Sequence, residues 1–365
     1  MGNELLLVIV IGTALAFDFT NGFHDTANAM ATSIATRALP PRVAVALAAV
    51  LNVAGAFLSL KVATTISKDI VDSSQISLEV LLAALVGAIS WNLVTWLFSL
   101  PSSSTHALIG GVIGAAWIAD GSGAVDVDGV VGTVIVPAVV SPVIAGAVAV
   151  LGTFLAFKIA RRLSGGVGTR GYRVGQIGSA SLVSLAHGTN DAQKTMGVIT
   201  LALVVHGSLD KSAGTPTWVI LAAALSIGLG TYVGGWRIIE TMGHKLTKIE
   251  PPQGFAAESS AASVLLASSY FGYPLSTTHI VSGAVVGSGI GRRLSEVRWS
   301  LARRIVLAWL VTLPAAAAVA AGVYEAVTQL GGHSAGPVLM AVLALAAAGA
   351  LFRIAQRHPV TASDV

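Results

Sequence analysis

The chain has 365 residues, of which 54% are hydrophobic and only 10% are charged, and its mean hydropathy is +0.80. Soluble domains carry about a quarter charged residues, so this composition excludes a chain made of ordinary soluble domains. The net charge of +4 comes from scattered basic residues and makes no nucleic-acid-binding domain, while the absence of cysteine excludes disulfides and thiolate metal sites. We therefore expect an all-α integral membrane protein.

Apolar stretches of about 20 residues or more, the length that crosses a bilayer, follow one another along the chain. The N-terminal stretch lacks a basic region and a cleavage site, so it is predicted to be a membrane helix rather than a signal peptide. Four of the stretches are interrupted by polar residues. In chain order the stretches cover 4–36 (interrupted), 43–60, 78–119 (interrupted), 129–159, 176–205 (interrupted), 217–239, 257–291 (interrupted), 304–327 and 336–353.

The interruptions fall at 21–25, 101–106, 187–191 and 274–279. The second and fourth begin with a proline, which ends or kinks the preceding helix, and they continue with Ser and Thr, which cap the next one. We predict that 101–106 and 274–279 are the tips of two re-entrant helical hairpins. The first and third place Asp25 and Asp191 inside interrupted helices.

Lysine and arginine favour cytoplasmic loops. If the spans alternate and the hairpins enter and leave on one side, 17 of the 21 basic residues fall on one side of the membrane and three on the other. Lys194 falls within a span. This distribution predicts that the N-terminus lies outside the cell and the C-terminus in the cytoplasm, in the cell (inner) membrane.

The two halves of the chain resemble each other. The pattern Gly22-x-x-Asp25 recurs as Gly188-x-x-Asp191, and seven of 14 positions are identical between 101–114 and 274–287. Because the halves begin on opposite sides, we predict an inverted-topology repeat, an architecture typical of secondary transporters. The predicted divisions are a first repeat (1–160), a short cytoplasmic linker (161–175), a second repeat (176–327) and an extra helix with a tail (328–365).

The two hairpin tips offer a donor-rich cradle for an anion. A helix N-terminus presents free N–H groups and the positive end of the dipole, and hydroxyl groups surround both tips. A tetrahedral oxyanion fits this set, although hydroxyls that only cap broken helices are the alternative for either tip alone. The hydroxyl-bearing residues are Ser103, Ser104 and Thr105 in the first tip, and Ser276, Thr277 and Thr278 in the second.

The intramembrane carboxylates Asp25 and Asp191 are costly and therefore indicate function. These carboxylates would repel an anion. They therefore have to be neutralised by a sodium ion, by a proton or by a metal that is carried with the anion. Asn28 shares a helix face with Asp25, while Asn190, Gln193 and Lys194 surround Asp191. An ion pair between Asp191 and Lys194 at i+3 is the structural alternative.

Histidines accompany both kinds of motif. His106 and His279 follow the hydroxyl runs at matched positions, and we expect them to support the hairpins. His24, beside Asp25, is the better candidate for proton handling, because histidine titrates near neutrality.

Together these motifs resemble the PiT family of inorganic phosphate transporters, in its bacterial low-affinity branch. The matching segments are GFHDTANAMATSIATRAL at 22–39, HGTNDAQKTMGVITLAL at 187–203 and the two P-x-S-x-T-H hairpins. The resemblance implies a phosphate site formed by the six hairpin hydroxyl residues with Asp25, Asn28, Asn190, Asp191 and Gln193. We expect a cation site formed by Asp25, Asp191, His24, Asn28, Asn190 and Glu258, with His106, His279 and Lys194 in support. The resemblance also implies a membrane homodimer.

The family's more widespread signature GANDVAN reads GFHDTAN here, and the His24 form resembles members that use protons, whereas sodium-coupled members carry Asn. We therefore expect a symporter that imports inorganic phosphate with protons or sodium, free or as a metal–phosphate complex, without a cofactor. Symport of sulfate or another oxyanion is the alternative. A passive channel is a weaker alternative. An intramembrane hydrolase using Ser, His and Asp is another, and it is weaker because catalysis needs one activated serine whereas this set of residues is present twice.

Overall fold

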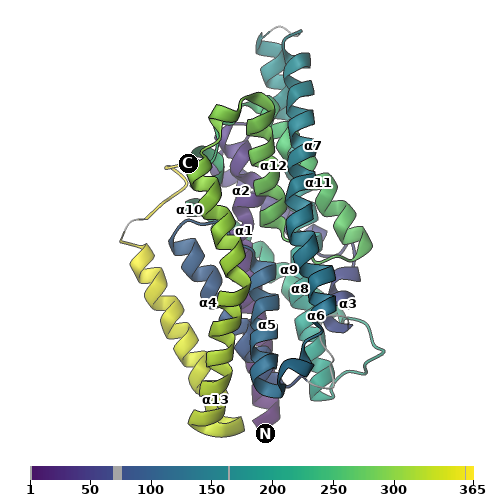
Figure 1. Cartoon of the computed structure of the whole chain (residues 1–365), viewed down its shortest axis with the longest axis vertical. Coiled ribbons are helices and arrows are strands. Elements are labelled where there is room, and N and C mark those ends of the chain that lie inside the picture. The colour runs from purple at the N-terminus through teal and green to yellow at the C-terminus, as the bar shows by residue number, and fades with distance from the viewer. Residues whose placement is uncertain (1, 69–75, 163–164, 358) are drawn as a thin grey trace.

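The structure is a computed structural model, and it describes residues 2–68, 76–162, 165–357 and 359–365. Within these residues the chain is almost entirely helical, and an isolated bridge between Thr247 and Val297 is the β pairing found. Long helices run roughly along the longest axis of the molecule (Figure 1). This all-α architecture confirms the predicted fold class.

The helices of the first half lie between the N-terminus and Ala160. They are α1 (Gly2–Ala35), α2 (Pro41–Gly55), α3 (Lys61–Lys68), α4 (Leu78–Leu97), α5 (Ser104–Asp120), α6 (Val127–Val130) and α7 (Val136–Ala160). Those of the second half are α8 (Gly165–His206), α9 (Thr217–Val233), α10 (Trp236–Glu240), α11 (Pro251–Phe271), α12 (Thr277–Arg292) and α13 (Trp299–Ala355). Because α8 already begins at Gly165, it includes most of the predicted linker 161–175, of which 163–164 lie outside the described residues.

Within the described residues, five helical segments are long and apolar enough to cross a membrane, or six if a bent pair counts as one span. These are Asn3–Ala35, Leu78–Leu97, Val127–Ala160, Trp299–Gln329 and Ala335–Ala355, with Thr217–Val233 and Trp236–Lys245 bent by 60°. The last two full segments both belong to α13, and the chain reverses direction between them at the lower end of Figure 1.

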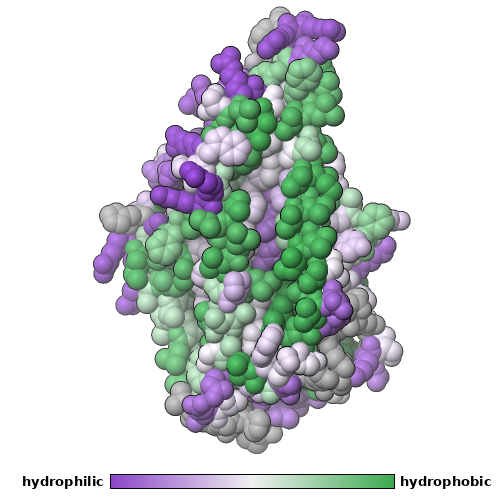
Figure 2. Space-filling model, in the orientation of Figure 1, coloured by the Kyte–Doolittle hydropathy of each residue, from purple (hydrophilic) through white to green (hydrophobic). Residues whose placement is uncertain are grey.

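Apolar side chains face outward along the middle of the molecule. Figure 2 shows hydrophobic residues over α7 and α13, with hydrophilic residues gathered towards the upper end. Val143 and Leu151 of α7 and Leu310 of α13 are exposed by 60% or more. Such a surface suits lipid rather than water, so the protein crosses the membrane several times.

The helix breaks lie at the hairpins and not at the other two polar interruptions. α4 ends at Leu97 and α5 begins at Ser104, and in the second half α11 ends at Phe271 and α12 begins at Thr277. By contrast α1 and α8 continue without a break through 21–25 and 187–191. The expectation that Asp25 and Asp191 lie in interrupted helices is therefore wrong. Their side chains are polar, but the backbone keeps its helical hydrogen bonds.

Each hairpin packs against a long helix from the other half of the chain. A Cβ at Gly110 or Gly114 of α5 would meet the backbone of α13, and one at Gly283 or Gly287 of α12 would meet the backbone of α7. Because only glycine allows this approach, these glycines serve close helix packing, as their spacing predicts. The two halves thus interlock, which brings both hairpin tips to the same region.

Candidate functional site

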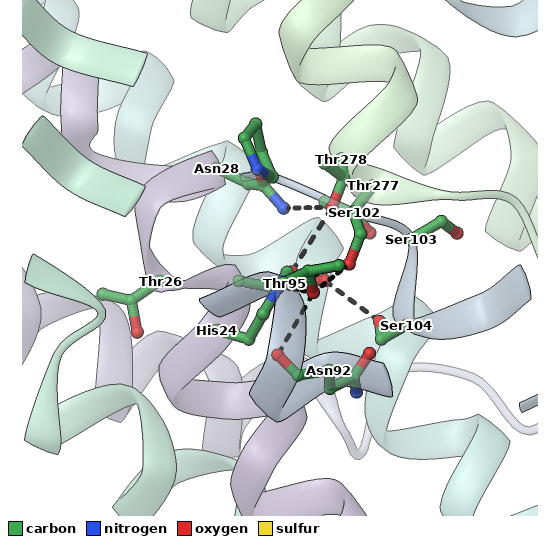
Figure 3. Close-up of polar contacts among 12 residues, drawn as sticks. His24, Thr26, Asn28, Asn92, Thr95, Ser102, Ser103, Ser104, Thr277 and Thr278 are labelled. Atoms are coloured by element: carbon green, nitrogen blue, oxygen red, sulfur yellow. Dashed lines mark hydrogen bonds and ion pairs between the residues drawn. The ribbon is translucent and has the colours of Figure 1, made fainter. Parts of the chain in front are cut away.

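Both hairpin tips begin their second helix with a serine cap. The side chain of Ser103 accepts a hydrogen bond from the backbone N–H of His106 at 3.1 Å, and that of Ser276 accepts one from His279 at 3.2 Å. Each cap satisfies one of the free N–H groups of the first turn. Ser103 points away from the polar cluster in Figure 3. These two predicted phosphate contacts therefore act as helix caps in this structure.

The other tip residues converge on Asp25 from both halves of the chain. The hydroxyl of Ser104, from the first tip, donates to Asp25 Oδ2 at 3.1 Å, and that of Thr278, from the second tip, lies 3.3 Å from Oδ1. Asn28 donates its amide to the Thr278 hydroxyl at 2.9 Å. All four side chains are buried (Figure 3). The two tips thus share one carboxylate.

His24 pairs with Asp25 on one side and contacts two hydroxyl groups on the other. Its Nδ1 lies 2.7 Å from Asp25 Oδ1, while its Nε2 lies 3.3 Å from Thr95 Oγ1 and 3.4 Å from Ser102 Oγ (Figure 3). Thr95 and Ser102 are hydrogen-bonded to each other at 2.7 Å. The imidazole is 1% exposed, so this chain connects the buried carboxylate to hydroxyl groups of the hairpin without contact with bulk solvent.

Asp191 carries two basic partners on its own helix. Its Oδ1 accepts a short hydrogen bond from Lys194, three residues later, and its Oδ2 lies 3.1 Å from His187 Nε2, four residues earlier. Thr277 of the second tip donates to Oδ1 at 3.1 Å. The i+3 ion pair with Lys194 is therefore present. The pair also contacts the second hairpin tip through Thr277. It therefore acts both as an ion pair within α8 and as part of the site at the hairpin tips.

The Lys194 ammonium reaches both hairpin tips. It donates to Thr105 Oγ1 at 2.6 Å and to the carbonyl oxygen of Leu275 at 3.2 Å, and its side chain is completely buried. A charge this deeply buried is tolerated only when it is paired and hydrogen-bonded. Lys194 thus places a fixed positive charge between the tips and Asp191.

The two signature carboxylates lie close to each other. One ligand atom from each of Asp25, His187 and Asp191 lies within 4.8 Å of the other two. The Lys194 ammonium balances the charge of Asp191, and the imidazole of His24 adjoins Asp25. Since a carboxylate and an imidazole are also cation ligands, this grouping could hold a cation.

His187 is a site residue that the sequence reasoning missed. Its signal was available, because it stands four residues before Asp191 and therefore on the same face of a helix. Its Nδ1 lies 3.1 Å from Asn52 Oδ1, which fixes the ring against α2. Asn52 in turn donates to Thr231 of α9 at 2.7 Å, and no pattern in the sequence indicated that contact.

Glu258 lies in a separate polar cluster on α11. Its carboxylate accepts hydrogen bonds from Ser33 at 2.7 Å, Ser179 at 2.8 Å and Gln176 at 3.3 Å, and a short one from Thr32. The donors come from α1 and α8, the helices that also carry Asp25 and Asp191. Because all four donors are neutral and no ion pair among the described residues includes Glu258, this buried carboxylate is a second place where a positive charge could bind.

The remaining predicted residues lie at the edge of the site or outside it. Asn190 donates to Ser268 at 3.5 Å. Gln193 accepts from the backbone N–H of Ala63 in α3 at 3.1 Å and donates to its own helix, so it is engaged away from the tips. The rings of His106 and His279 meet edge to face with centroids 4.7 Å apart, and His279 contacts the carbonyl of Ala138 at 3.2 Å.

Comparison with known proteins identifies relatives over the whole chain. The sequence model of a family described as the phosphate transporter family matches residues 21–169 and 165–320. A probable low-affinity inorganic phosphate transporter of Mycobacterium tuberculosis (strain ATCC 25618 / H37Rv) is 55% identical over 361 residues, covering 99% of this chain and 86% of the relative. One of Bacillus subtilis (strain 168) is 44% identical, covering 88% of this chain and 96% of the relative.

A solved structure with the same fold is also similar. It is described as the sodium-dependent phosphate transporter, has a TM-score of 0.80 and 26% sequence identity, and covers 89% of this chain and 100% of its own. The likeness therefore extends from the sequence motifs to the arrangement of the helices.

Proposed function

Because this chain belongs to the phosphate transporter family, we propose that it imports inorganic phosphate across the cell membrane by symport with protons. Its relatives are named as transporters, and the chain is a multi-pass membrane transporter rather than an enzyme.

The site explains how a positive charge would make phosphate binding favourable. In the structure, Ser104 and Thr278 donate to Asp25, and Thr277 donates to Asp191. Phosphate needs the same hydroxyl donors, so it competes with the carboxylates for them. A phosphate held by Ser104 would lie about 5 Å from Asp25, where one negative charge costs about 3 kcal/mol at an effective dielectric constant of about 20.

Protonation of the pair formed by His24 and Asp25 removes this repulsion. A neutral carboxyl group is a weaker acceptor and can itself donate a hydrogen bond, so Ser104 and Thr278 are released to the anion. Proton and phosphate binding then favour each other by linkage, and each ligand increases the affinity for the other by the same factor. This reciprocity is what a symporter requires.

Lys194 is the single observation that favours protons over sodium. Its ammonium bonds to Asp191, to Thr105 and to Leu275, which is the position that a coupling cation between the second carboxylate and the tips would occupy. A fixed charge there leaves Asp25 as the carboxylate that needs a mobile cation. Since His24 already lies 2.7 Å from it, a proton is the simplest ion that this pair can take up.

A metal–phosphate complex is a second candidate substrate. It is favoured by the 4.8 Å grouping of Asp25, His187 and Asp191, whose oxygen and nitrogen atoms suit a divalent ion. Sulfate is a third candidate by donor chemistry alone. A carboxyl group that shares a proton with the ligand favours phosphate, because sulfate is fully ionised at neutral pH.

Two further features of the proposal concern the molecule in its membrane. The distribution of the basic residues supports a cytoplasmic C-terminus and an N-terminus outside the cell. The exposed apolar surfaces of α7 and α13 (Figure 2) offer contact area for lipid or for the second subunit of a homodimer. The inverted orientation of the two halves stays a prediction, which the matched serine caps and the interlocked hairpins support.

The experiment is radiolabelled phosphate uptake into proteoliposomes with imposed gradients of protons or of sodium, each with and without magnesium. We expect accumulation driven by a pH gradient, no requirement for sodium or magnesium, and little competition by sulfate. Accumulation that follows only the sodium gradient would refute proton coupling. A strict magnesium requirement would favour the metal–phosphate complex, and equal competition by sulfate would refute the choice of substrate.

A further inference from the structure

One buried acidic residue has no part in the site described above. Asp18 lies on α1, two helical turns before Asp25, and its side chain is 0% exposed. Neither of its carboxylate oxygens has a hydrogen-bond partner among the residues that the structure describes. The Thr195 hydroxyl of α8 faces it but stays outside hydrogen-bond geometry.

Buried apolar residues adjoin Asp18 and Thr195 in the chain. Phe17 and Met196, the chain neighbours of Asp18 and Thr195, are both fully buried members of the same apolar cluster. Among the described residues, the charged groups that act on Asp18 are Asp191 and Lys194 of α8, and these two neutralise each other. No positive charge is therefore left over to balance an ionised Asp18. Because an isolated buried carboxylate is very costly, Asp18 must carry a proton or a bound cation.

Asp18 is also aligned with the transport site. Positions 18, 21, 25, 28 and 32 repeat every three or four residues and so lie on one face of α1, and all five side chains are polar and buried. This stripe runs from Asp18 through Asp25 to Thr32, which donates to Glu258. With a rise of 1.5 Å per residue, Asp18 and Asp25 are about 10 Å apart along the helix.

Asn21 lies between the two carboxyl groups, and both polar atoms of its side chain also lack partners. Asn92 is in the same situation on α4, one turn from Thr95, which contacts His24. Unpaired buried polar groups cost free energy, so their accumulation beside the transport site indicates a ligand-binding region rather than a packed core.

We propose that Asp18 is a second proton site of the transport cycle, so that a proton bound there crosses the membrane with each phosphate in addition to the one on His24 and Asp25. This inference rests on the proposed function. In each cycle Asp18 binds a proton from the side where α1 begins and releases it on the other side, which regenerates the carboxylate. A carboxyl group that never changed its protonation state would be replaceable by asparagine without effect.

The test compares the wild type with Asp18→Asn and Asp18→Glu in proteoliposomes, with Asp210→Asn as control, since Asp210 lies exposed in a loop. Two quantities are measured: phosphate–phosphate exchange without a gradient, and equilibrium accumulation under a pH gradient of one unit. Each coupled proton contributes about tenfold to accumulation at this gradient. We expect Asp18→Asn to keep exchange and to lose about tenfold in accumulation, while Asp18→Glu and Asp210→Asn behave as the wild type.

Equal accumulation by Asp18→Asn and the wild type would overturn the inference. If Asp18→Asn also loses phosphate exchange, its accumulation cannot be interpreted. The protonation of Asp18 is then measured directly by infrared difference spectroscopy. We expect a protonated-carboxyl band that responds to pH in the wild type and is missing in Asp18→Asn. The absence of that band, or a band that responds to sodium and not to pH, would overturn the proton assignment. Failure of phosphate exchange in the wild type would instead refute the proposed function. In that case the infrared measurement would still decide whether Asp18 binds and releases a proton.

Discussion

Replacing Lys194 tests the electrostatic balance of the site most directly. Its ammonium lies 2.6 Å from Thr105 Oγ1, and a phosphate oxygen accepting from that hydroxyl would lie about 2.7 Å further on. The positive charge would therefore be about 5 Å from the anion. At an effective dielectric constant of about 20, this attraction is worth about 3 kcal/mol, which is somewhat more than a hundredfold in affinity.

The substitution Lys194→Gln removes the charge and keeps a hydrogen-bond donor. It leaves Asp191 facing Asp25 with ligand atoms within 4.8 Å, a repulsion of again about 3 kcal/mol under the same assumption. We expect the Kd for phosphate to rise about a hundredfold in sodium-free buffer. We also expect sodium to restore part of the affinity, because the position beside Asp191 then needs a mobile cation.

The assay is equilibrium binding of radiolabelled phosphate to the purified protein, with and without sodium. Lys211→Gln is the matched control, because this lysine lies exposed in a loop. Gel filtration and thermal unfolding verify that the variant is folded. A change in Kd of less than about threefold, with no response to sodium, would refute the assignment of Lys194 as the fixed counter-charge.

Three other substitutions test separate parts of the structure. His24→Asn should lower accumulation driven by a pH gradient of one unit about tenfold in proteoliposomes but retain phosphate exchange, and unchanged accumulation would contradict the proton pair. Glu258→Gln should lower the accumulation driven by a pH gradient but leave the Kd for phosphate unchanged, since the carboxylate lies outside the hairpin tips. The surface substitution Glu325→Gln is the control. Full accumulation by Glu258→Gln would exclude Glu258 from coupling. Gly22→Ala places a Cβ against the backbone of α9 and should lower the free energy of unfolding by about 1–3 kcal/mol, whereas Gly12→Ala has open space and should be neutral in thermal melts.

Several features followed from the sequence because they depend on neighbouring residues. The apolar spans follow from composition over about 20 residues. The hairpin tips follow from Pro101 and Pro274 with the hydroxyl runs behind them, because proline stops a helix and serine starts one. The matched motifs also identified Asp25 and Asp191 as intramembrane carboxylates.

The sequence misjudged the backbone around these carboxylates. Polar runs at 21–25 and 187–191 suggested breaks, yet α1 and α8 are continuous. Several polar side chains of these two helices contact other helices instead, as when Asn28 bonds to Thr278 and His187 contacts Asn52. Helix breaking depends on the backbone, and side-chain polarity alone does not require it.

The sequence by itself determined the membrane helices, the two hairpins and the residue types that a coupled anion site needs. Only the tertiary structure decided which of these residues meet: both tips on Asp25, Lys194 between Asp191 and Thr105, and Gln193 turned towards α3. It also showed that Asp18 has no partner. The physical reason is that capping and hydropathy are set by residues close in the chain, whereas the contacts between the hairpin hydroxyl groups and the charged side chains join residues 79 or more positions apart.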